Sequence, residues 1–332
     1  YFLTSIILGV VLTFLIYNAG KIIFAKIAGY RVSYIKILGF LIDKSNGKAK
    51  IKFDILSFFE LSLQFTPKDD DVKKNPKLIF LGGFIAEFIL VVVALVLFFV
   101  LGFNQVKTTR SAIGWTALFI MSYGFLTPLY EILPFRQDFP TDMFNLLVTS
   151  NEEDKIAFNV VLINKKNEHA GKDYMPYEFE DYDSFYKCRV LHANYLDHLY
   201  ASRLEKAFNV LEEMRYYNKY LNDADRYLPY GEMIYLHFFI NDDKGADATY
   251  LSMKKDDKKV VATPVLLSDY RTALLIAGLI SSDSEKVKEI EAKFEKATKE
   301  FESEPSKRIA KEKELFMGAI NKIKTTKPEL HI

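Results

Sequence analysis

The sequence predicts a mostly α-helical protein in two parts: a membrane domain with three transmembrane helices and a small β element, then a cytosolic domain of helical hairpins. Residues 1–148 contain three long apolar runs, whereas residues 149–332 are rich in charge, tyrosine and alternating Lys and Glu. Half of all residues are hydrophobic, which excludes a disordered chain, and the long runs exclude a wholly soluble protein. The net charge of +1 gives no electrostatic reason to expect nucleic acid as a partner.

The apolar runs are long enough to cross a bilayer. They cover about residues 2–25, 78–103 and 112–133, and at roughly 1.5 Å per residue each spans a hydrocarbon core about 30 Å thick. A signal peptide is the alternative for the first run, but no basic residues precede it and no A-x-A cleavage site follows it. We therefore expect three transmembrane helices within residues 1–148.

Loop charge predicts how these helices are oriented. Nine Lys and Arg residues lie in residues 31–76, between the first two runs, whereas the next loop carries only Lys107 and Arg110. The positive-inside rule places the more basic loop in the cytoplasm, so the N-terminus is expected outside and the C-terminal domain inside. The single cysteine, Cys188, cannot form an internal disulfide, which agrees with a reducing compartment. The expected localisation is the cell membrane, with multiple spans.

A β-rich insert follows the first run. Residues 30–65 contain two stretches rich in β-branched and aromatic residues, YRVSYIKILGFLI and KAKIKFDILSFFELSLQF, separated by DKSNG. This pattern predicts a β-hairpin or a small sheet at the membrane surface. An amphipathic segment lying in the interface is the alternative.

Short motifs occur in a fixed order along residues 1–148. Three residues lie at or just after the end of the first run, a glycine pair lies in the second, and two residues follow the third: Ala25, Lys26 and Gly29, then Gly82 and Gly83, then Pro134 and Asp142. This order resembles the site-2 protease-like intramembrane metallopeptidases. That family has a three-helix core, an H-E-x-x-H motif near the end of the first core helix, a β-rich stretch, a glycine-rich second helix and an Asp-Gly motif after the third. The resemblance implies the same core fold.

The metal motif of that family is replaced in this chain. Where the family has H-E-x-x-H, residues 17–21 read Tyr-Asn-Ala-Gly-Lys, and Met143 stands where the family has the Gly of Asp-Gly. Asp142, at the position of the third metal ligand, is kept. The degenerate metal-site positions are therefore Tyr17, Asn18, Lys21 and Asp142.

These replacements remove the chemistry of zinc hydrolysis. Catalytic zinc binds imidazole or carboxylate and keeps one position for water, and none of the five histidines lies in residues 1–148: they are His169, His192, His198, His237 and His331. Tyr17 is a poor zinc ligand, Asn18 cannot act as a general base, and Lys21 is a cation that repels a metal. We expect a catalytically inactive pseudoprotease without metal or cofactor.

Two further acids form a candidate polar site within the apolar runs, namely Glu87 and Glu131. A charge at Glu87, in the middle of the second run, is costly, so this residue should be protonated, paired or facing a wet interior. Because the family holds one metal ion between the positions of Lys21 and Asp142, the resemblance implies that these two side chains lie close together, with the ammonium in place of the cation. Snorkelling of Lys21 to the cytoplasmic surface is the alternative.

Residues 149–178 are expected to form a connecting helix and linker, and residues 179–332 a domain of helical hairpins. Ser150 with Glu153 and Ser202 with Glu205 read as capping boxes. An apolar helical periodicity recurs at offsets of 42 and 41 residues, aligning Leu204, Ala207 and Leu211 with Ala246, Thr249 and Met253 and with Val287, Ile290 and Phe294. The pattern resembles tetratricopeptide-type repeats, with longer units. An irregular helical domain is the alternative.

Stacked helical hairpins present concave faces that bind peptides or proteins. We therefore expect an inactive intramembrane-protease-like protein that binds a membrane segment, a peptide or a partner protein through its core and its helical repeats. An intramembrane peptidase with a non-standard site is one alternative. An accessory subunit of a membrane transporter or peptide-export complex is another.

Overall fold

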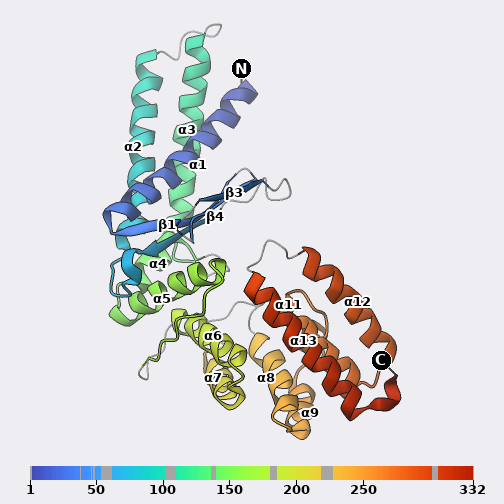
Figure 1. Cartoon of the computed structure of the whole chain (residues 1–332). Helices are drawn as coiled ribbons and strands as arrows, with labels where there is room; N and C mark the ends of the chain where they lie inside the picture. The colour runs from blue at the N-terminus through green and yellow to red at the C-terminus, as the bar shows by residue number, and fades with distance from the viewer. Residues whose placement is uncertain are drawn as a thin grey trace. The chain divides into compact units, whose positions relative to one another are not determined.

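Helices dominate the chain, with one small sheet between the first and second of them. The computed structural model in Figure 1 describes all residues except 1, 38, 46, 48, 54–61, 102–108, 136–139, 180–184, 218–226, 301–305 and 332. The chain divides into two compact units, residues 1–163 and residues 164–332. The expected mostly helical fold with a small β element is confirmed at this level.

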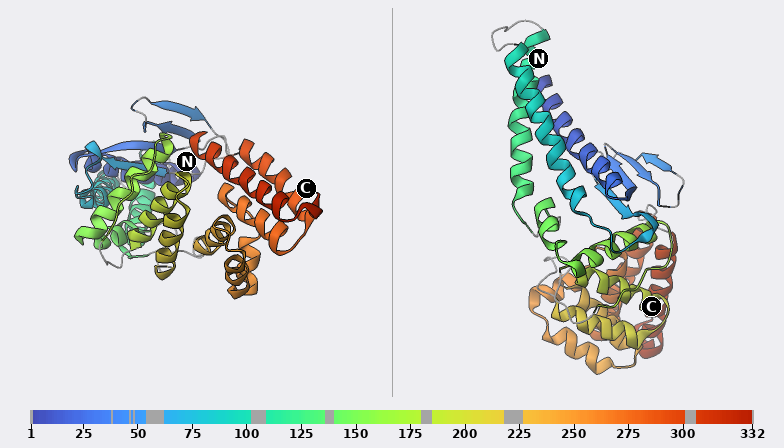
Figure 2. Two further views of the ribbon diagram at one scale, coloured as in Figure 1. Left: turned by 60° about the horizontal axis from the view of Figure 1, so that its bottom comes forward. Right: turned by 90° about the vertical axis from the view of Figure 1, so that its left-hand side faces the viewer.

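Three long helices pack against one another in the first unit, as Figures 1 and 2 show. They are α1 (Phe2–Ile27), α2 (Lys77–Leu101) and α3 (Thr109–Ile132). Each contains a stretch long and apolar enough to cross a membrane, namely Phe2–Ile27, Lys77–Val100 and Ala112–Ile132.

The distribution of apolar and small residues on these helices is the one expected in an apolar solvent. Large apolar side chains of α2 point outwards, with Phe88 70%, Phe99 73% and Val100 74% exposed. The buried positions of α1, in contrast, are mostly small or polar: Ser5, Gly9, Thr13, Tyr17, Gly20 and Ala25. Helices that associate in a bilayer pack through small and polar residues because lipid solvates their apolar faces. This inverted pattern favours a membrane setting for the unit.

Glycines allow α1 and α2 to approach closely where they cross. A Cβ added to Gly20 would lie 2.4 Å from the carbonyl oxygen of Gly82, and one added to Gly83 would lie 2.5 Å from the ring of Tyr17. Neither distance is possible for real atoms, so larger residues would force the helices apart. The close crossing holds Tyr17 against α2.

An antiparallel sheet follows α1, with strand order β3-β2-β1-β4. Its strands are β1 (Tyr30–Ile37), β2 (Phe40–Asp43), β3 (Lys50–Phe53) and β4 (Ser62–Pro67). Gly29, with a φ of 82°, turns the chain from α1 into β1. The predicted small sheet is confirmed for the described residues, whereas residues 54–61 of the predicted insert lie outside them.

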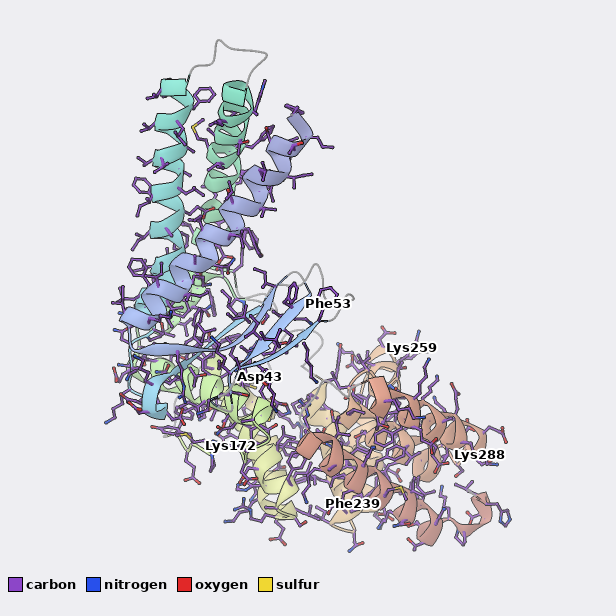
Figure 3. The ribbon with its side chains drawn as sticks, turned by 45° about the horizontal axis from the view of Figure 1, so that its top comes forward. Asp43, Phe53, Lys172, Phe239, Lys259 and Lys288 are labelled. Atoms are coloured by element: carbon purple, nitrogen blue, oxygen red, sulfur yellow. The ribbon has the colours of Figure 1, made fainter. Side chains whose placement is uncertain are left out.

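The hairpin of β2 and β3 has one apolar face. Phe40 pairs with Phe53 and Ile42 with Ile51, so these four side chains lie on the same side of the two strands. Phe40, Ile51 and Phe53 are each 49% exposed or more, and Figure 3 shows Phe53 on β3. Lys50 and Lys52 alternate with them and lie on the other side.

Two shorter helices complete the path out of the first unit. In α4 (Asp142–Val148), the hydroxyl of Thr141 caps the first turn by accepting the N–H of Phe144. In α5 (Glu152–His169), the cap is Asn151, whose side chain accepts the N–H of Glu153. The predicted capping box at Ser150 is wrong, because the N-cap is one residue further along and the Ser150 hydroxyl instead donates to the carbonyl of Leu146 in the preceding turn.

The second unit consists of consecutive helices that pack pairwise, and Figure 2 shows them from two further sides. The helices are α6 (Phe185–Tyr200), α7 (Leu204–Tyr216), α8 (Leu228–Phe239), α9 (Asp243–Ser252), α10 (Lys255–Val261), α11 (Leu267–Leu275), α12 (Ser284–Glu300) and α13 (Ser306–Thr326). Helix α6 packs on α7, α8 on both α7 and α9, and α11 on α8, α12 and α13. The predicted capping box at Ser202 does not form, since Arg203 occupies the N-cap of α7 without a side-chain hydrogen bond.

A buried charge network ties four of these helices together. The guanidinium of Arg271 on α11 is fully buried and binds Glu232 on α8 through two hydrogen bonds of 2.5 and 3.0 Å. Its Nε donates to Glu312 on α13 at 3.1 Å. Glu232 also accepts the hydroxyl of Tyr195 on α6. The network satisfies each buried charge, which is the condition for burying them without a large penalty.

Candidate functional site

The carboxylate of Asp142, the first residue of α4, is the centre of a polar cluster in the first unit. One carboxylate oxygen accepts the ammonium of Lys21 at 2.7 Å, and the other accepts the hydroxyl of Tyr17. The backbone N–H of Asp142 donates to a carboxylate oxygen of Glu131 at 2.7 Å. Helices α1, α3 and α4 therefore meet at Asp142, whose side chain is only 4% exposed.

Local geometry explains why these groups converge. Tyr17 and Lys21 are four residues apart on α1 and so project from the same face of the helix. The Lys21 nitrogen lies 5.5 Å from the centre of the Tyr17 ring. The Thr141 hydroxyl holds the start of α4 in place by donating to the carbonyl of Leu133 at 2.7 Å. The carboxylate of Glu131 lies at the N-terminus of α4, where the helix dipole favours negative charge.

The expected contact between Lys21 and Asp142 is present, and the snorkelled position of Lys21 is not adopted. The structure also brings Tyr17 and Glu131 into the cluster. Asn18 stands apart: its amide donates to the carbonyl of Phe14, within its own helix, at 2.8 Å. The sequence gives no signal for the bond between Glu131 and the Asp142 backbone, because it depends on the path of the chain after α3.

Glu87 lies beside this cluster but is not bonded to it. It follows Gly83 by one helical turn on α2, on the side that packs against Tyr17. Its side chain is completely buried, and neither carboxylate oxygen has a hydrogen-bond partner among the described residues.

The carboxylate of Asp142 is held in place by two donors from α1, so the cluster forms a fixed polar contact between helices. Both oxygens of Asp142 are occupied by donors from α1. Among the described residues, no group of three or more His, Cys, Asp or Glu side chains is placed to hold a metal ion. A charge-assisted pair with a second neutral donor is a strong fixed contact.

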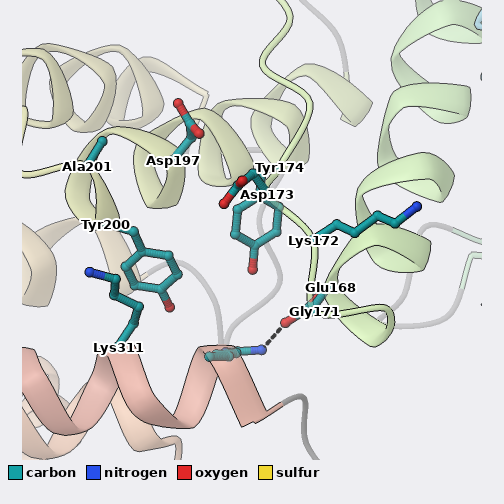
Figure 4. Close-up of a pocket in the computed structure, with 10 residues that line it drawn as sticks. Glu168, Gly171, Lys172, Asp173, Tyr174, Asp197, Tyr200, Ala201 and Lys311 are labelled. Carbon is teal, nitrogen blue, oxygen red and sulfur yellow. Dashed lines mark hydrogen bonds and ion pairs between the residues drawn. The ribbon is translucent and has the colours of Figure 1, made fainter. Parts of the chain in front are cut away.

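A separate pocket of about 380 Å³ lies in the second unit, at the start of α13 (Figure 4). Tyr174 and Tyr200 line it with ring centres 6.5 Å apart, and an ion pair between Arg308 and Glu168 closes one side. Acidic and basic side chains occur in equal number along its wall. The sequence does not reveal this pocket, since its walls come from three distant segments.

In the described part of the second unit, the histidines do not join other side chains in a group placed to hold a metal ion. Burial, assisted by the nearby Arg308, Arg271 and Arg189, lowers the pKa of His192 to about 4. His192 is partly buried and stacks on the ring of Tyr195 at a centroid distance of 6.3 Å.

No protein-family model, curated protein or solved structure matches this chain. Proposals about its role therefore depend on the residues and contacts described above.

Proposed function

We propose that the chain is an inactive, multi-pass membrane protein with the scaffold of the site-2 protease-like family, which binds a partner in place of hydrolysing a substrate. The observation that carries this proposal is the ion pair of Lys21 with Asp142 at 2.7 Å. It puts an ammonium group beside the carboxylate that, by resemblance, would be the remaining metal ligand. A cation supplied by the chain itself makes a bound metal unnecessary for charge balance.

The order of elements supports the scaffold. Helix α1 ends in a short turn and the sheet, α2 brings a glycine pair against α1, and α4 starts at Asp142 after α3. The outward apolar faces of α1, α2 and α3 support insertion in a bilayer. The basic loop of residues 31–76 supports an outside N-terminus and a cytoplasmic second unit.

The atoms present at the cluster support the proposed loss of catalysis. Hydrolysis at such a site needs a metal-activated water and a general base. Asn18 carries no basic group and turns back on its own helix, and Lys21 occupies Asp142. What the scaffold still offers is a rigid polar cluster between helices and a platform of helical hairpins.

Packing in the second unit supports the hairpin platform. The residues aligned across the repeats are largely buried in α7, in or directly after α9, and in α12: Ala207 and Leu211, Ala246 and Met253, and Val287, Ile290 and Phe294. Equivalent positions therefore serve equivalent packing roles. We propose that these hairpins bind a membrane protein or a peptide, as concave helical stacks do.

A gain-of-function variant tests the scaffold. The combined substitution Tyr17→His, Asn18→Glu and Lys21→His restores two imidazoles and a general base around Asp142. We expect the purified triple variant to bind one zinc ion per chain and the wild type to bind none, as measured by metal analysis after detergent extraction. Failure of the triple variant to bind zinc, while remaining folded, would argue against the scaffold.

Activity of the wild type tests the loss of catalysis. A membrane-spanning substrate peptide, incubated with the wild-type chain and zinc, should remain intact. Cleavage that stops on adding a chelator and in Asp142→Ala would establish the peptidase alternative. Co-purification of a stoichiometric membrane transporter in mild detergent would instead favour the accessory-subunit alternative.

A further inference from the structure

Glu87 lies in the interior of the bundle formed by α1, α2 and α3, which we call the three-helix unit. Its α2 neighbour one turn earlier, Gly83, faces the ring of Tyr17, so Glu87 lies on the inner side of α2. On the opposite wall is Gly124 of α3, where an added Cβ would lie 3.8 Å from the Cγ and 3.9 Å from a carboxylate oxygen of Glu87. Glu87 is 0% exposed.

Both carboxylate oxygens of Glu87 lack a hydrogen-bond donor in the described part of the chain. The donors of the adjoining cluster are already used. On α1, the Tyr17 hydroxyl and the Lys21 ammonium both bind Asp142. The backbone N–H of Asp142, on α4, binds Glu131 of α3.

An ionised carboxylate in this position would be a fully buried anion without a hydrogen-bond donor among the described residues. Burial of such a charge is strongly disfavoured, and a carboxyl group avoids the penalty by keeping its proton. We propose that Glu87 is a proton-binding site inside the three-helix unit and carries a proton at neutral pH.

The charges around Glu87 are consistent with a proton, rather than a metal ion, as the ligand of its carboxylate. The ammonium of Lys21 is already paired with Asp142, so it does not balance the negative charge that an ionised Glu87 would add to the interior. A bound sodium or calcium ion would require several oxygen ligands around it. Among the described residues, no such group of acidic side chains converges on Glu87. This proton site follows from burial and stands whether or not the unit binds a partner.

Infrared difference spectroscopy of the full chain in lipid vesicles tests the proposal directly. A protonated carboxylic acid gives a C=O stretching band that is separate from carboxylate and amide bands and shifts in deuterated water. We expect this band in the wild type at neutral pH, its loss in Glu87→Gln, and its retention in Glu131→Gln. A wild-type spectrum without a band that Glu87→Gln removes would overturn the proposal.

Chemical labelling of the wild type gives a second measurement that requires no variant to fold. Dicyclohexylcarbodiimide enters bilayers and reacts with protonated carboxyl groups in apolar surroundings. We expect mass spectrometry to locate the adduct on the peptide containing Glu87, with a labelling rate that falls as pH rises. Labelling that is confined to Glu131, or that sodium suppresses while pH has no effect, would overturn the proposal.

Discussion

At the residue scale, the pairing of Lys21 with Asp142 is the part of the site that could be predicted from the sequence. The expectation came from the positions of two residues relative to a known motif, and the contact is formed at 2.7 Å. Tyr17 and Glu131 were named as candidate site residues, but their hydrogen bonds to Asp142 were not predicted. They depend on the helix crossing at Gly83 and on the turn capped by Thr141, which place a hydroxyl and a backbone N–H within bonding distance.

Removing one partner of the ion pair between Lys21 and Asp142 should destabilise the protein more than removing both partners. Lys21→Met leaves the Asp142 carboxylate buried with one neutral donor, and we expect a loss of about 3 kcal/mol in unfolding free energy. The double variant Lys21→Met/Asp142→Asn removes both charges and should recover more than half of that loss. Denaturant titration in detergent measures the unfolding free energy of both variants. Asn18→Ala is the control, expected to change stability by about 0.5 kcal/mol or less. Losses that simply add in the double variant would contradict the pairing.

At the element scale, helical periodicity predicted α7 and α12 well, because their apolar faces pack into one core. Capping residues were predicted less well. The actual caps depend on one-residue differences in where the chain leaves the preceding turn, as at Ser150 and Asn151. The buried network of Arg271 was not predicted at all. It joins residues up to 117 positions apart, Tyr195 to Glu312, and only the packing of α6, α8, α11 and α13 brings them together.

His192 on α6 should make the second unit sensitive to acid. Its pKa is lowered to about 4 in the folded state, by burial and then by Arg308, Arg271 and Arg189, whereas an unfolded His titrates near pH 6.5 (an approximate reference value). Between these values the unfolded chain binds the extra proton, so stability is lost as pH falls through this window.

We expect His192 to account for a loss on the order of 3 kcal/mol between neutral pH and pH ~4. Thermal denaturation of the full chain over this range measures it. His192→Gln should flatten the acid limb, whereas His331→Gln, at an exposed position, should leave it unchanged. An equally steep acid limb in His192→Gln would show that other groups cause the loss.

At the scale of the whole molecule, the division into an apolar and a polar part was evident from the sequence because composition changes along the chain. The three candidate spans follow directly from run length. The pattern of outward apolar and inward small residues needed the structure, since it depends on which face of each helix meets a neighbour.

The proposed topology can be tested by cysteine accessibility, because the chain has a single native cysteine and Cys188 is buried. In a Cys188→Ser background, we place new cysteines at Ser45 in the basic loop and at Ser284 in the second unit. Both should resist a membrane-impermeant maleimide in intact cells and react after lysis, because the positive-inside rule puts both in the cytoplasm. A cysteine at Thr108, which lies between the second and third candidate spans in the sequence, should react in intact cells. Labelling of Ser45→Cys before lysis would contradict the proposed orientation. If only one of Ser45→Cys and Ser284→Cys were labelled in intact cells, the chain between them would cross the membrane an odd number of times, which would contradict the two spans proposed there.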